Sequence, residues 1–151
     1  VMKFSSTPEF AFAVLDLSDA YRNVYSFYRG AALIDRRNIL IQDEIVTDVN
    51  SEILWGMITG AKIELNGNSA LLSIGDQRLG LTILGEIDST FEIISASPPL
   101  PQDQNDGYQK LAFKIKSQAG LNRFAVLMTP YNENKELRTS EVELESLGNW
   151  K

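Results

Sequence analysis

The 151-residue chain is long enough for one domain with a hydrophobic core, and its 44% hydrophobic and 23% charged residues are ordinary for a globular protein. A formal net charge of −6 argues against nucleic acid as a partner, because phosphate binding needs a basic surface. The sequence contains no cysteine and no histidine, which excludes disulfides and thiol chemistry and removes the commonest general base and metal ligand. No run of about 18 apolar residues occurs, so we expect no membrane span.

The chain is a series of short segments with the pattern of β-strands. Residues 1–9 are polar and are expected to be held loosely, as at the start of a piece taken from a longer protein. The predicted strands cover residues 10–17, 24–35, 38–46, 52–59, 62–65, 70–74, 77–84, 90–95, 108–117 and 123–128. Turns at a spacing of about 8–12 residues predict an all-β fold, an antiparallel β-sandwich of about ten short strands. We expect a single domain over residues 1–151.

The two longest predicted strands form a hairpin with Arg36-Arg37 at its tip. In the register that this tip implies, Arg29 lies opposite Glu44 and the two form a cross-strand ion pair. Both faces of the hairpin are largely apolar, so we expect it at the centre of its sheet and covered on both sides.

Two later segments depart from the strand pattern. Residues 97–107 contain three prolines, two aspartates and a glycine, which predicts a surface loop because proline provides no backbone donor. The tail from residue 132 onward is charged, with a weak alternation over residues 141–147 and Trp150 near the end.

Several kinds of chemistry lack the residues that they need. Nucleophilic triads require a base beside serine or cysteine, and no glycine-rich nucleotide motif is present. Four aspartates could supply oxygen ligands for calcium, namely Asp16, Asp19, Asp35 and Asp43. Their sequence setting is ordinary turn chemistry, so we predict neither a metal site nor a bound cofactor.

Aromatic and basic side chains gather at the start of the central hairpin: Tyr21, Tyr25, Tyr28, Arg22 and Arg29. An aromatic ring can stack on the face of a sugar, and a guanidinium binds a carboxylate or sulfate through two hydrogen bonds, so this combination suits acidic sugars. Trp55 is a further candidate platform. For any single aromatic residue at a strand position, packing in the core is the commoner role.

Five segments, in this order, resemble the C-terminal β-rich domain of the heparinase II/III-type polysaccharide lyases, a group that includes the oligoalginate lyases. The segments are DLSDAY at 16–21, YRGAALIDRRNILIQDEI at 28–45, LWGMITGAKIEL at 54–65, NDGYQKLAFKI at 105–115 and FAVLMTPY at 124–131. Together they extend over nearly the whole chain.

The resemblance implies a function that the residues alone do not give. Members of this family join an α/α-toroid to β-sheet domains and β-eliminate polysaccharides that contain uronic acid, such as glycosaminoglycans or alginate, with a tyrosine and histidines. It therefore implies a C-terminal accessory domain, inactive alone, that follows an α/α-toroid domain of the same chain and contacts an acidic polysaccharide or oligosaccharide. The catalytic tyrosine would be one of Tyr21, Tyr25 and Tyr28, and Arg22, Arg29 and Trp55 would contact the substrate. The resemblance also implies a periplasmic or secreted location.

The sequence departs from the family at one position. Where members often carry a histidine linked to a structural zinc, this chain has Ile58, and the nearest match to the accompanying aspartate is Asp16 or Asp19. We therefore expect no zinc site. Two other functions remain open, a free-standing carbohydrate-binding or adhesion module and a purely structural domain that supports a partner.

Overall fold

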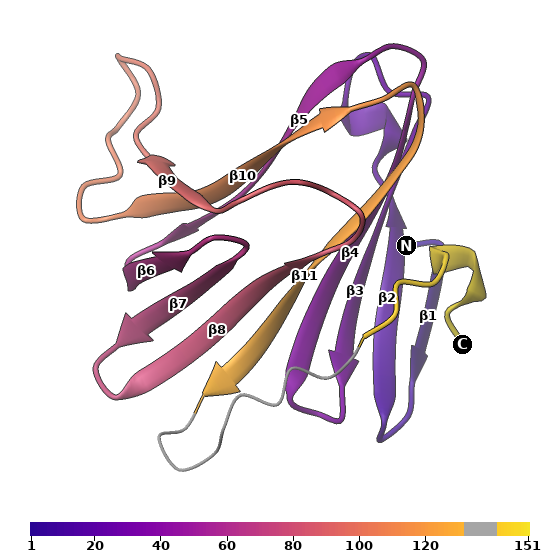
Figure 1. Cartoon of the computed structure of the whole chain (residues 1–151), viewed down its shortest axis with the longest axis horizontal. Coiled ribbons are helices and arrows are strands. Elements are labelled where there is room, and N and C mark those ends of the chain that lie inside the picture. The colour runs from indigo at the N-terminus through magenta and orange to yellow at the C-terminus, as the bar shows by residue number, and fades with distance from the viewer. Residues whose placement is uncertain (132–141) are drawn as a thin grey trace.

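The structure is a computed structural model that describes residues 1–131 and 142–151. It contains eleven β-strands and two short 3-10 helices, η1 (Ser18–Ala20) and η2 (Leu147–Asn149). The strands are β1 (Lys3–Ser6), β2 (Phe10–Asp16), β3 (Ser26–Ile34), β4 (Asn38–Thr47), β5 (Ser51–Thr59), β6 (Lys62–Asn66), β7 (Ser69–Ile74), β8 (Gln77–Leu84), β9 (Glu92–Ser95), β10 (Gln109–Ser117) and β11 (Gly120–Tyr131). The predicted all-β antiparallel sandwich is confirmed (Figure 1). Within the described residues, no helix has the length and hydropathy that crossing a bilayer requires.

The strands form two antiparallel sheets of unequal size. The large sheet has the order β1-β2-β3-β4-β11-β8-β7-β6, and the small sheet has the order β5-β10-β9. The small sheet lies over one half of the large sheet (Figure 1). Between them is a core that includes Trp55, Leu81, Phe113, Phe124 and Val126, all of which are buried. This inner face contains the pocket described below.

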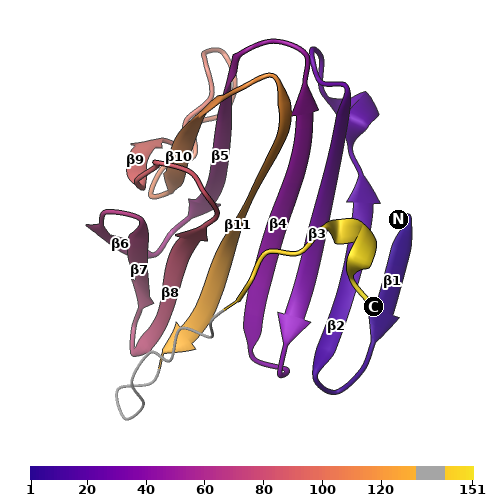
Figure 2. The same ribbon diagram turned by 45° about the vertical axis from the view of Figure 1, so that its right-hand side comes forward.

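The outer face of the large sheet is covered by the end of the chain. Residues 142–151 cross β4 and β3 and end near β1 (Figure 2). Trp150 is buried there and meets the rings of Phe10 and Phe12 edge-on, with centroid distances of 5.5 and 5.7 Å. Gly30 is required at this contact, because a Cβ at that position would lie 2.6 Å from the Trp150 ring and still closer to Leu147.

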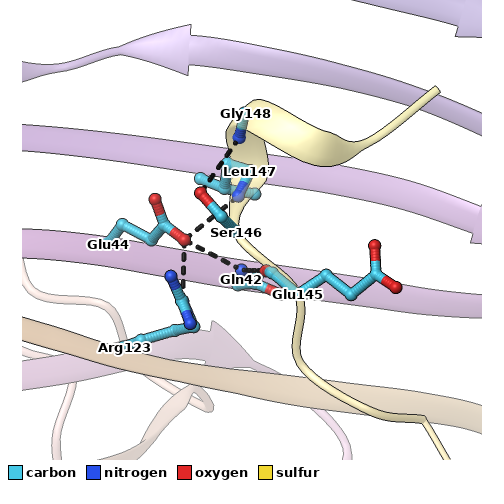
Figure 3. A network of polar contacts seen from close by, with 7 residues as sticks. All are labelled: Gln42, Glu44, Arg123, Glu145, Ser146, Leu147 and Gly148. Atoms are coloured by element: carbon cyan, nitrogen blue, oxygen red, sulfur yellow. Dashed lines mark hydrogen bonds and ion pairs between the residues drawn. The ribbon is translucent and has the colours of Figure 1, made fainter.

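A buried polar network holds the same segment in place (Figure 3). One carboxylate oxygen of Glu44 accepts hydrogen bonds from Arg123 Nε at 2.7 Å and from the backbone N–H of Leu147 at 3.0 Å. Gln42, which is completely buried, donates through Nε2 to the carbonyl oxygen of Glu145 at 2.6 Å. These bonds replace the hydrogen bonds to water that the Leu147 N–H and the Glu145 carbonyl lose when the tail packs on the sheet.

The predicted register of the central hairpin is wrong by one residue. Three residues, 35–37, form the loop, and Asp35 and Arg36 adopt positive φ angles of 51° and 52°. Arg29 consequently lies opposite Asp43, and Glu44 lies opposite Tyr28. A shift of one residue turns every side chain of a strand to the other face, and two apolar faces gave no signal against the wrong choice.

Other sequence predictions differ from the structure at the ends of the fold. Residues 3–6 form the edge strand β1, which pairs with β2, whereas a loosely held segment was expected. The hairpin is central in its sheet as predicted, but the cover on its inner face is incomplete. The weak alternation predicted over residues 141–147 is not strand where the structure describes it, although Val142 and Leu144 pack against the outer face.

Candidate functional site

A pocket of about 260 Å³ opens between the two sheets, where the connection from η1 to β3 meets β3, β4 and the first residues of β5. Four of the six side chains predicted from the sequence line it: Tyr21, Arg22, Arg29 and Trp55. Residues from three separate segments of the chain therefore meet at one site.

The charged centre of the pocket is an ion pair between two neighbouring strands. Arg29 Nε and Nη2 donate to the two carboxylate oxygens of Asp43, each at 2.7 Å. The Asp43 side chain is 2% exposed, and the Arg29 side chain is 34% exposed. Burial raises the pKa of Asp43 above its ordinary value, while the guanidinium of Arg29 acts in the opposite direction. The hydrogen bonds to Asp43 raise the pKa of Arg29, so this side chain stays charged.

Aromatic rings form the apolar part of the site. The Tyr21 ring packs on Phe27 at a centroid distance of 5.0 Å. The Arg29 guanidinium also lies over the Phe27 ring, at 5.5 Å from its centroid. Tyr21 itself is 53% exposed. Trp55 is only 6% exposed and stacks on Phe113 at 5.3 Å, so it forms the floor of the pocket rather than an open platform.

The two remaining tyrosines do not line the pocket. Tyr25 is 84% exposed and lies just before β3. Tyr28 is half-buried on the outer face of the large sheet, where it packs against the cluster that includes Phe12 and Trp150. Because neighbouring side chains of a strand point to opposite faces, Tyr28 and Arg29 cannot reach the same pocket.

The aspartates considered for a metal are not gathered together. No group of three or more His, Cys, Asp or Glu side chains in the described residues has a geometry that could hold a metal ion. Asp16 instead accepts hydrogen bonds from the Ser18 hydroxyl at 2.6 Å and the Ser18 amide at 3.0 Å, and these bonds lower its pKa. Ile58 is 49% exposed and lies opposite Lys110.

A larger groove of about 1230 Å³ lies near the turn between β10 and β11. Its ionic lining consists of three cations and three carboxylates: Lys114, Lys116, Arg123, Glu52, Glu86 and Asp88. The charges balance, and none of the described residues that line it is aromatic. The charges of the smaller pocket balance as well, since Asp43 and Glu52 accompany Arg22 and Arg29. The smaller pocket is the better candidate site because the exposed ring of Tyr21 gives it a stacking surface, which the groove lacks.

Sequence reasoning missed two members of the pocket, Asp43 and Phe27. From the sequence, Asp43 is considered only as a calcium ligand, because the register that is one residue out sets Arg29 against Glu44; a carboxylate in a central strand was nevertheless a signal that a cation should face it. Phe27 could have been assigned by alternation, since it shares a face with Arg29.

The chain's arrangement is matched by known structures, although no family model and no curated protein matches its sequence. A crystal structure of heparan sulfate lyase HepC from Pedobacter heparinus is similar, with a TM-score of 0.69 and 15% identity over 88% of this chain and 22% of that chain. A crystal structure of heparinase III gives a TM-score of 0.68 at 13% identity, over 87% of this chain and 21% of that one.

These likenesses confirm, at the level of the fold, the resemblance to the β-rich part of heparinase-like lyases. The chain spans about a fifth of the length of the structures that it matches, at 21% and 22% of theirs.

Proposed function

We propose that the chain is a β-sandwich domain of a heparinase-like polysaccharide lyase, inactive alone, and that its pocket lines one wall of the substrate cleft in the complete enzyme. The observation that carries the proposal is the likeness of fold to heparan sulfate lyase HepC over 88% of this chain. A shared fold does not by itself give a shared function, so the site must support it independently.

The chemistry of the pocket supports an acidic sugar as its ligand. Asp43 accepts from Nε and from one N–H of Nη2 of Arg29, which leaves the other N–H of Nη2 and both N–H groups of Nη1 for a carboxylate or sulfate. Arg22 is exposed at the mouth of the pocket and adds a second cation. The half-exposed ring of Tyr21 supplies a surface on which a pyranose can stack.

The pocket does not contain all the groups that β-elimination requires. Removing the C5 proton of a uronate requires a base suited to that step, and the sequence has no histidine. Tyrosine, with an ordinary pKa of about 10, is mostly protonated at neutral pH. We therefore assign Tyr21 to the cleft wall as the candidate tyrosine that lines the pocket with Arg22 and Arg29, and expect the remaining catalytic groups on another part of the same enzyme.

The test compares the 151-residue chain with the product of the complete reading frame on heparan sulfate, heparin and alginate. Elimination creates a C4–C5 double bond that absorbs in the ultraviolet, so turnover is read directly. We expect no product from the 151-residue chain and product from the complete protein. Clear turnover by the 151-residue chain, lost in Tyr21→Phe, would place the whole active site here and contradict the proposal.

A matched pair of arginine variants tests the pocket in the complete protein. Arg22→Ala removes a cation from the pocket mouth and should raise KM by roughly tenfold, the value of one charge-assisted hydrogen bond. Arg36→Ala removes the same charge at the distant hairpin tip, where Arg36 donates to the carbonyl oxygen of Thr7 at 2.7 Å, and should leave KM unchanged. Equal KM values for the two variants would remove Arg22 from the substrate site.

A free-standing carbohydrate-binding module is the second candidate, because the three predicted substrate contacts, Arg22, Arg29 and Trp55, already lie together on this chain with Tyr21. That function predicts that the 151-residue chain alone binds a heparan sulfate oligosaccharide as tightly as the complete protein does. We also propose a periplasmic or secreted location for the enzyme, for which a secretory leader in the complete reading frame is the test.

A further inference from the structure

Within residues 1–131 and 142–151, no second layer covers one part of the inner face of the large sheet. The small sheet covers β11, β8 and β7 and meets the Phe27 end of β3, while β1 and β2 lie beyond it (Figure 1). The pairing of adjacent strands defines a single row of neighbours across the sheet: Phe4, Ala13, Ala31, Ile41, Val126 and Ile83. At one end of this row Phe4 is 78% exposed, and at the other end Val126 and Ile83 are buried.

The uncovered half has the composition of a buried face. Between the Arg29–Asp43 pair and the 35–37 loop, the inner side chains of β1–β4 are Phe4, Ser6, Ala11, Ala13, Ala31, Leu33, Ile39 and Ile41. Ser6 is the single polar residue in that set, and none is charged. Ile39 belongs to a central strand and is nevertheless 39% exposed. We call these eight residues the open face.

A sheet that faces water on one side normally shows polar residues there, in alternation with its apolar side. The open face is apolar instead, and a contiguous apolar patch on a folded domain marks a surface that packs against something. It is not suited to the acidic sugar proposed for the pocket, because none of its eight residues is charged. Arg36, a cation at its edge, already donates to Ser6 Oγ at 3.3 Å and to the carbonyl oxygen of Thr7 at 2.7 Å.

We propose that the open face is covered by another part of the same longer polypeptide, through an apolar and uncharged contact surface. The inference rests on the proposed function in one respect, namely that this chain is one domain of a longer enzyme. The structures with this fold support that occupant, since the matched part is only 22% of the HepC chain. A second copy of this chain is disfavoured by charge, because each copy carries a formal net charge of −6.

The absence of native cysteine in this chain allows a direct test. Ala31→Cys and Ala13→Cys each place a thiol on the open face with a small change in volume. Asp76→Cys places the control thiol in the exposed turn between β7 and β8. Each variant is made in the 151-residue chain and in the complete protein, and its reaction with a maleimide is followed by peptide mass spectrometry.

We expect both open-face thiols to react at least tenfold more slowly in the complete protein than in the 151-residue chain, and the control thiol to react equally fast in both. Equal rates for the open-face thiols would overturn the proposal. It would also be overturned if those thiols are already protected in a dimeric 151-residue chain, since a second copy would then be the occupant. The proposal would be overturned as well if the complete reading frame encoded no polypeptide beyond these 151 residues.

The result of the thiol-protection test can be told apart from the result of the lyase assay. A complete protein that protects the open-face thiols but releases no unsaturated uronate contradicts the lyase assignment and supports the covered face. An active lyase whose open-face thiols stay reactive supports the function and overturns this inference.

Discussion

Replacing Arg29 with alanine tests the ion pair on which the pocket is built. The change leaves the Asp43 carboxylate, 2% exposed, without its cation and without two hydrogen bonds of 2.7 Å. Breaking a fully buried pair on one side costs about 3–5 kcal/mol, and an exposed pair contributes about 0–1 kcal/mol. Since the Arg29 side chain is 34% exposed, we expect an intermediate loss of about 2–3 kcal/mol in the free energy of unfolding.

Urea denaturation, followed by the fluorescence of the two tryptophans, measures this loss. With a slope of about 1–3 kcal/mol per molar urea, the midpoint of Arg29→Ala should fall by roughly 1 M. Arg36→Ala is the matched control, because Arg36 is exposed and its removal should cost about 0–1 kcal/mol. Equal midpoints for the two variants would refute the account of the pair.

The loss of stability caused by Arg29→Ala should also depend on pH, and the burial of Asp43 decides the direction of that dependence. Without Arg29, burial alone acts on Asp43, so its pKa in the folded state lies above its unfolded-state value of about 3.9. The ionised carboxylate then destabilises the variant at pH 7, and the penalty disappears as the pH falls below both pKa values. The difference in midpoint between the Arg29 and Arg36 variants should therefore be smaller at pH 4 than at pH 7, and a difference that grows on acidification would contradict this reasoning.

Two further predictions concern the tail and the metal. Gly30→Ala should destabilise the fold by about 1–3 kcal/mol and alter the emission of Trp150, because the added Cβ overlaps the tail. Gly56→Ala is its control, since the nearest atom there is a flexible lysine carbon at 3.2 Å, and a loss as large as that of Gly30→Ala would disprove the clash. Elemental analysis of the dialysed chain should find no zinc, because a zinc site normally takes Cys and His ligands, and one zinc per chain would show that Ile58 was misjudged.

The fold class was predictable because it depends on the period of the apolar residues and on the spacing of the turns. Alternating apolar residues and frequent turns predict short antiparallel strands whatever their order in the sheet. The pairing of β11 with both β4 and β8 was not predictable, since contacts between segments so distant in sequence leave no local signal. The edge strand β1 was missed because its pattern, KFSS, contains a single large apolar residue.

Residues of the candidate site could be selected from the sequence by residue type, but the sequence did not show on which face of a strand each of them lies. Tyr21, Arg22, Arg29 and Trp55 were selected by residue type and do line one pocket. Tyr28 was selected by the same criterion but lies on the opposite face, which strict alternation against Arg29 would have shown.

Charge contributes to the register of the central hairpin. Asp43 and Glu44 are adjacent on β4, so they point to opposite faces, and each is buried with an arginine from a neighbouring strand. Arg29 of β3 pairs with Asp43 on the inner face, and Arg123 of β11 pairs with Glu44 on the outer face. A slip of one residue between β3 and β4 would set Arg29 against Glu44, as the sequence first suggested, and would leave Asp43 buried without a cation.

That arrangement carries a penalty of several kcal/mol. It would also turn the buried Phe27 away from the inner core and move Gly30 from its contact with Trp150. We therefore infer that the two carboxylates help to select the observed register. The same selection places Arg29 in the pocket and leaves Glu44 to hold the tail, so the candidate site and the cover of the outer face depend on one pair of adjacent residues.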